Sequence, residues 1–129
     1  ERFVRTPVFD RNHLAPLTAQ LLAAVENCHG AHFRGAREGR LVNTLAFTVA
    51  GTDSIALMAA LDLAGVCASS GSACSAGSLE PSHVMLALGA PAAEANALVR
   101  LSLGRASTAA EVATVCALLP RVLQQVRRT

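Results

Sequence analysis

Two amphipathic stretches, one near each end of the chain, most strongly constrain what this sequence can fold into. Leucine and valine recur every three or four positions from Asn12, a candidate helix cap, to about Asn27, and again after Thr108. Thr108 and Glu111 have the spacing of a capping box, and Pro120 is a residue that can kink the second helix. The two patterns therefore predict two helices, each with an apolar face.

The sequence between these helices predicts strands and shorter helices in alternation. Strands are predicted at residues 31–34, 41–50, 66–68 and 98–103, where apolar and polar residues alternate or where apolar and β-branched residues are frequent. Helices are predicted at residues 54–64, 82–88 and, for a turn or two, 91–97. This order predicts a single domain over residues 1–129 of the α+β class, with a small, mostly antiparallel sheet and helices packed on one face.

Composition excludes several classes of function. Hydrophobic residues make up 52% of the chain and aromatics only 3%, so the core must be aliphatic. No apolar run is long enough to span a bilayer and no leader is recognisable, so we expect no membrane partner. Four irregularly spaced cysteines without a CxxC pair favour a reducing cytoplasm. A net charge of +2, without aromatics between the arginines, argues against nucleic acid.

One stretch has the composition of a mobile arm that carries a thiol. Residues 69–79 are almost all serine, alanine, glycine and cysteine, so little in them can anchor in a core. Residues 80–82 have the acid and the proline of a helix start. Cys74 lies near the middle of the arm, and we interpret it as a working thiol. The alternative is an ordinary loop cysteine with a normal pKa.

Two other residues are candidates to act with Cys74. No lysine or arginine lies between Arg40 and Arg100, so the local groups that could activate the thiol are His83 and the helix start beside it. We expect the group that accepts the proton of the Cys74 thiol to come from outside this part of the sequence. Arg100 lies among apolar strand residues; facing inward it would need an anion, and its planar fork suits a carboxylate. An outward-facing edge arginine fits the pattern equally well.

The remaining cysteines and histidines do not predict a metal site. Cys28, His29 and His32 are close in sequence, but a structural zinc site needs four ligands and no fourth candidate is evident. We therefore predict no metal, and a metal-binding domain that uses these three residues stays as a third hypothesis. Cys67 and Cys116 fall on apolar faces and are expected to be buried and inert.

Several motifs together resemble one known family. Residues 69–74, followed by residues 77–84, resemble the active-site loop of the NifS/IscS-like cysteine desulfurases, which are class V aminotransferase relatives of fold type I. Residues 100–105 resemble the segment that follows this loop, and residues 40–45 the strand entry that precedes it. The resemblance extends over most of the chain, and the arm is similar to that of the subgroup with a long mobile loop.

The resemblance implies a pyridoxal phosphate (PLP) enzyme that acts on L-cysteine. In the complete enzyme a lysine of a large domain holds the cofactor, the Cys74 thiolate attacks the substrate sulfur, and Arg100 holds the substrate carboxylate. A persulfide forms on Cys74 and alanine is released. The resemblance also implies a homodimer, a sulfur acceptor or iron–sulfur scaffold protein as partner, and a role in iron–sulfur cluster assembly.

The sequence departs from the family in one decisive respect, because it contains no lysine. We therefore expect residues 1–129 to correspond to the C-terminal small domain without the PLP-binding large domain. Such a chain would bind no PLP covalently and would be inactive by itself. The second hypothesis is a non-enzymatic thiol or persulfide carrier, or a module that docks to a separate large subunit. The acceptor, and the preference between cysteine and selenocysteine, stay open.

Overall fold

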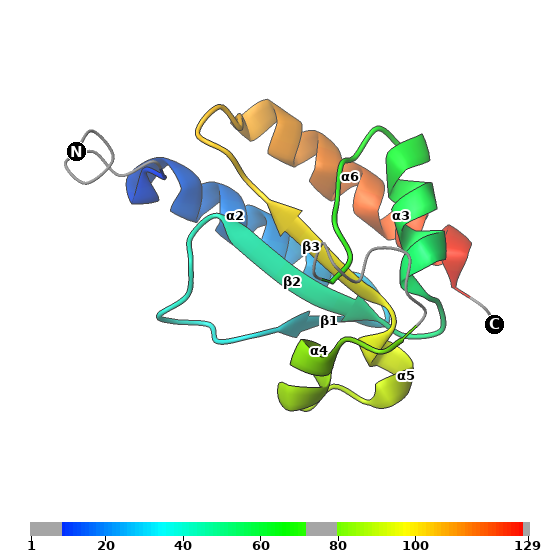
Figure 1. Ribbon diagram of the computed structural model, residues 1–129. Coiled ribbons are helices and arrows are strands. Elements are labelled where there is room, and N and C mark those ends of the chain that lie inside the picture. The colour runs from blue at the N-terminus through cyan, green and yellow to red at the C-terminus, as the bar shows by residue number, and fades with distance from the viewer. Residues whose placement is uncertain (1–8, 72–79, 128–129) are drawn as a thin grey trace.

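A computed structural model describes residues 9–71 and 80–127, which form an antiparallel sheet with packed helices (Figure 1). The helices are α2 (Arg11–Glu26), α3 (Ser54–Leu63), α4 (His83–Ala87), α5 (Ala92–Ala95) and α6 (Ala109–Val126). The strands are β1 (Ala31–Arg34), β2 (Thr44–Val49) and β3 (Leu98–Ser102). The α+β class predicted from the sequence is confirmed.

The sheet has the strand order β1-β2-β3, and both pairs of neighbours are antiparallel. The predicted strand at residues 66–68 is wrong. The Val66 amide donates to the Leu61 carbonyl oxygen at 2.8 Å, which closes the end of α3 in the manner of a Schellman motif with Gly65 at φ +78°. Beyond these residues, Ser69 makes an isolated antiparallel bridge to Arg100 on the other edge of β3 from β2.

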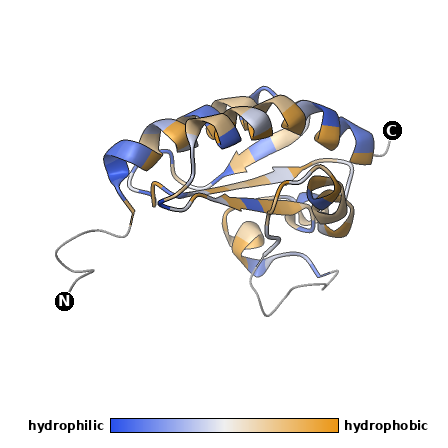
Figure 2. Cartoon of the chain, turned by 90° about the horizontal axis from the view of Figure 1, so that it is seen from above, coloured by the Kyte–Doolittle hydropathy of each residue, from blue (hydrophilic) through white to orange (hydrophobic). Residues whose placement is uncertain are grey.

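The two faces of the sheet have different environments because successive side chains on a strand point to opposite faces. One face packs against α2, α3 and α6 in the main hydrophobic core. Its largest fully buried side chains are Phe47, Leu14, Leu45, Leu57, Leu61, Leu119 and Leu123. On the opposite face a smaller cluster of Met85, Ala90, Ala95 and Leu98 joins α4 and α5 to one end of the sheet. Figure 2 shows the sheet between the long helices and these short helical segments.

The helix ends follow local sequence signals. Asp10, and not Asn12, caps α2, since the Asp10 carboxylate accepts a hydrogen bond from the Asn12 amide at 2.9 Å. The expected capping box between Thr108 and Glu111 is present at the start of α6. Helix α6 continues through Pro120 to Val126. The long helices thus cover one face, as predicted, and leave much of the other face open.

Candidate active site

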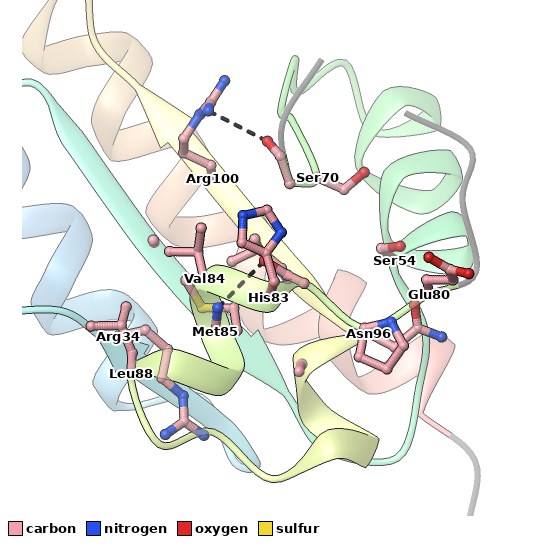
Figure 3. Close-up of a pocket in the computed structure, with 16 residues that line it drawn as sticks. Arg34, Ser54, Ser70, Glu80, His83, Val84, Met85, Leu88, Asn96 and Arg100 are labelled. Atoms are coloured by element: carbon pink, nitrogen blue, oxygen red, sulfur yellow. Dashed lines mark hydrogen bonds between the residues drawn. The ribbon is translucent and has the colours of Figure 1, made fainter. Parts of the chain in front are cut away.

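The open face of the sheet is the floor of a cavity of about 480 Å³. Side chains of β1, β2 and β3 line the floor, and residues of α4 and α5 line one wall (Figure 3). The remaining wall comes from Ser54, at the start of α3, and from residues 70–71 and 80–82. The cavity therefore gathers residues that are far apart in the sequence.

Arg100 lies on the floor of this cavity. It pairs with Ala46 in the middle of the sheet and alternates with Val99 and Leu101, whose side chains enter the main core, so its own side chain lies on the open face. Its Nη1 donates to the Gly71 carbonyl oxygen at a long 3.4 Å. Within residues 9–71 and 80–127, no carboxylate forms an ion pair with Arg100. None of these residues therefore neutralises the guanidinium through an ion pair.

Cys74 lies outside the described residues, within the segment 72–79. Both residues that border this segment, Gly71 and Glu80, line the cavity. Gly71 has φ +63°, a conformation that favours glycine. The segment that contains Cys74 therefore joins the described chain at the cavity at both of its ends.

His83 is the first residue of α4 and also lines the cavity. Ser82 caps this helix by accepting a hydrogen bond from the Met85 amide at 3.4 Å, and its own amide donates to the Ala95 carbonyl oxygen at 3.2 Å. The second of these contacts attaches the start of α4 to α5. The exposed imidazole of His83 points to the side of the cavity where Ser70 and Arg100 lie (Figure 3).

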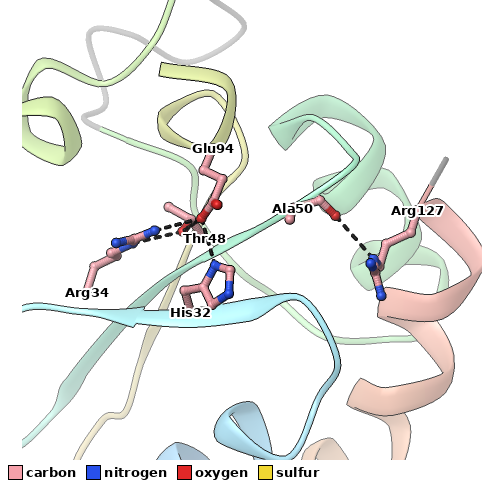
Figure 4. A network of polar contacts seen from close by, with 6 residues as sticks. All are labelled: His32, Arg34, Thr48, Ala50, Glu94 and Arg127. Atoms are coloured by element: carbon pink, nitrogen blue, oxygen red, sulfur yellow. Dashed lines mark hydrogen bonds and ion pairs between the residues drawn. The ribbon is translucent and has the colours of Figure 1, made fainter. Parts of the chain in front are cut away.

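A cluster of four polar side chains, here the Glu94 cluster, joins α5 to the open face of the sheet (Figure 4). Glu94 Oε2 accepts hydrogen bonds from Arg34 Nη2 at 2.6 Å and from the Thr48 hydroxyl at 3.1 Å, and His32 Nδ1 lies 2.7 Å away. Arg34 Nε also donates to the Thr48 hydroxyl oxygen at 2.9 Å. Sequence reasoning missed this cluster because Glu94 is 46 or more residues from each partner, with no local motif.

The cluster lowers the pKa of the Glu94 carboxyl. Burial alone would raise the pKa, but hydrogen bonds from His32, Thr48 and Arg34, together with the charge of His32, outweigh burial. Because the pKa is lower in the folded chain than in the unfolded chain, the ionised carboxylate stabilises the fold above its ordinary pKa. This contribution is lost as the pH falls through the folded-state pKa.

We expect Glu94→Gln to lower the free energy of unfolding by about 1–3 kcal/mol near pH 7, and by less as the pH falls through the folded-state pKa of Glu94, because the native carboxyl then also loses its charge. Urea unfolding over a series of decreasing pH values measures the difference. The matched control is Glu26→Gln, because the Glu26–Arg37 pair has side chains 37% and 68% exposed and is worth about 0–1 kcal/mol. If the free energy of unfolding that Glu94→Gln loses does not depend on pH, the assignment of a lowered pKa to the Glu94 carboxyl is wrong.

The other cysteines differ in their surroundings. Burial raises the pKa of the Cys28 thiol, with a further contribution from Cys116, and burial also raises the pKa of Cys116. Cys67 is exposed, so the expectation that it is buried is wrong; Val66 takes the buried position beside it. In the described part of the chain, no group of three or more histidine, cysteine or acidic side chains is placed to hold a metal ion. Nor is any helix there long and apolar enough to cross a membrane.

Comparison with known proteins identifies the family. Residues 9–115 match the family model of aminotransferase class-V. A cysteine desulfurase of Rhodobacter capsulatus is 37% identical over 118 residues, which are 92% of this chain and 31% of the relative. One of Azospirillum brasilense is 43% identical over 102 residues, which are 79% of this chain and 25% of the relative. The structure of a NifS-like protein from Rickettsia africae superposes with a TM-score of 0.74 at 23% identity, over 89% of this chain and 29% of that one.

The chain belongs to the class-V aminotransferase family. The resemblance to NifS/IscS-like cysteine desulfurases is confirmed, and the chain spans less than a third of the length of the curated relatives it matches. Relatives of this kind are PLP enzymes in their complete form. The cavity of this chain does not supply the amine that holds PLP, because no lysine lines it and the sequence contains none.

Proposed function

We propose that this chain is the C-terminal small domain of a cysteine desulfurase and that Cys74 is the nucleophile. The observation that supports this most directly is the cavity, in which Arg100 lacks a carboxylate partner among the described residues and whose lining includes Gly71 and Glu80, the two described residues that border the segment 72–79. Cys74 is three residues from Gly71 in the sequence. Since an extended chain spans at most about 3.6 Å per residue, covalent geometry keeps position 74 within about 11 Å of Gly71.

In the proposed reaction, Arg100 binds the carboxylate of L-cysteine through paired hydrogen bonds. The Cys74 thiolate attacks the substrate sulfur, so that an S–S bond forms and the substrate C–S bond breaks. The sulfur stays on Cys74 as a persulfide, and the three-carbon product takes up a proton and leaves as alanine. PLP supplies the electron sink that this cleavage requires. The candidate to influence the thiol is His83, which is the first residue of α4 and lines the same cavity as Arg100.

The same proposal includes the partners of the chain. A separate, lysine-bearing large domain holds PLP, and the complete enzyme is a cytoplasmic homodimer. A sulfur acceptor or iron–sulfur scaffold protein then takes the persulfide sulfur. Without the large domain, this chain is inactive and binds no PLP covalently.

Alkylation kinetics test the role of Cys74 in the chain itself. In a Cys67→Ser background, which removes the exposed competing thiol, we expect Cys74 to react faster than Cys28 and Cys116, whose pKa values are raised by burial. Mass spectrometry after brief iodoacetamide treatment locates the modified residue. If Cys74 reacts no faster than free cysteine, it is an ordinary loop thiol. If it reacts rapidly but the chain supports no alanine release with a PLP-bearing domain, the chain is a persulfide carrier.

A further inference from the structure

The floor of the cavity contains a second arginine in line with Arg100. Arg34 on β1 pairs with Ala46 on β2, and Ala46 pairs with Arg100 on β3. Residues that pair directly across an antiparallel sheet lie on the same face, so the two arginines flank the small side chain of Ala46. Their Cα atoms are two strand spacings, or about 9–10 Å, apart. Both arginines line the same cavity.

The two guanidinium groups differ in how their charge is balanced. Arg34 forms an ion pair with Glu94, and both side chains are only 17% exposed. The lowered pKa of Glu94 keeps its carboxylate ionised near neutral pH. Arg100 is exposed, and the part of the chain that the structure describes provides its guanidinium with only the Gly71 carbonyl oxygen. Glu80 also lines the cavity, on the side where Figure 3 shows Ser54 and Asn96 and away from Arg34.

We infer that Glu94 determines the charge specificity of the cavity: by neutralising Arg34, it leaves Arg100 as the cation for one carboxylate and disfavours amino acids with a second carboxylate. This inference rests on the proposed role of Arg100 in carboxylate binding. Without the charge of Glu94, Arg34 would attract a second carboxylate across Ala46. Glu94 lies outside the cavity lining, so it acts through Arg34 and not by contact with the ligand.

NMR titration of the full chain with L-alanine and, separately, with L-aspartate tests this inference. The quantity measured is the ratio of the dissociation constant of alanine to that of aspartate. We expect Glu94→Gln, which keeps the size of the side chain and removes its charge, to raise this ratio about tenfold in favour of aspartate. Glu94→Ala carries the same expectation if the glutamine variant does not fold. A loss of stability alone would weaken both ligands together and leave the ratio unchanged.

Two further variants separate this inference from the proposed function. Arg34→Gln combined with Glu94→Gln should restore the original ratio, because the second cation is then absent. Arg100→Ala should abolish the binding of both ligands. If Arg100→Ala abolishes binding but Glu94→Gln leaves the ratio unchanged, the inference fails and the role of Arg100 stands. If binding to the unsubstituted chain is absent or does not depend on Arg100, the inference also fails, and the nucleophilic role of Cys74 is still tested by its alkylation.

Discussion

Replacing Phe47 with alanine is expected to lower the free energy of unfolding by about 3–5 kcal/mol. Phe47 is fully buried at the centre of β2, where it pairs with Phe33 on β1 and with Val99 on β3. Apart from the partly buried Phe33, the surrounding core is aliphatic, and packed strands on both sides limit its collapse into the space left by the ring. A domain of this size is typically stable by about 5–15 kcal/mol, so the variant should lie close to unfolding at 25 °C.

Urea unfolding followed by circular dichroism measures this loss, and Leu63→Ala is the matched control. Leu63 lies on α3 with 89% of its surface exposed, so its truncation should change the free energy of unfolding by less than about 0.5 kcal/mol. Similar losses for the two variants would show that β2 is not the centre of the core. A protein that remains cooperative but unfolds at a lower urea concentration is the expected result for Phe47→Ala.

The elements with long, periodic patterns could be predicted from the sequence. Helices α2 and α6 and strand β2 each carry enough apolar residues at one spacing to define a buried face, and the capping box at Thr108 is a local signal. Residues 66–68 are too few to show a period. Their apolar composition fits a strand, yet the amide of Val66 closes the end of α3 instead.

The site could be predicted only where its residues form a motif along the chain. The segment around Cys74 and His83 resembles the family's active-site loop, and residues 100–105 resemble the segment that follows it, but the direction of the Arg100 side chain depends on which face of β3 the helices cover. The register with Ala46 settles that question. The Glu94 cluster depends on pairing between β1, β2 and α5, which local sequence does not encode.

Replacing Cys74 with serine is expected to abolish sulfur removal from L-cysteine in an enzyme that contains this domain. The assay uses a chimera in which this chain replaces the matched 118 residues of the Rhodobacter capsulatus cysteine desulfurase, so that the relative supplies the rest of the enzyme. A serine hydroxyl is far less nucleophilic than a thiolate at neutral pH and cannot hold a persulfide. Alanine release should therefore fall by at least about a thousandfold.

The matched control is Cys67→Ser, because Cys67 is the exposed cysteine in the described part of the same connection between α3 and α4. It should keep alanine release within about twofold, since substitutions at exposed positions away from the site have small effects. The absorbance of bound PLP shows that each chimera is folded and loaded. If Cys74→Ser retains alanine release while PLP stays bound, another group attacks the substrate sulfur and the assignment of Cys74 is wrong. If only Cys67→Ser loses activity, the nucleophile lies at the other end of the connection, outside the cavity that contains Arg100.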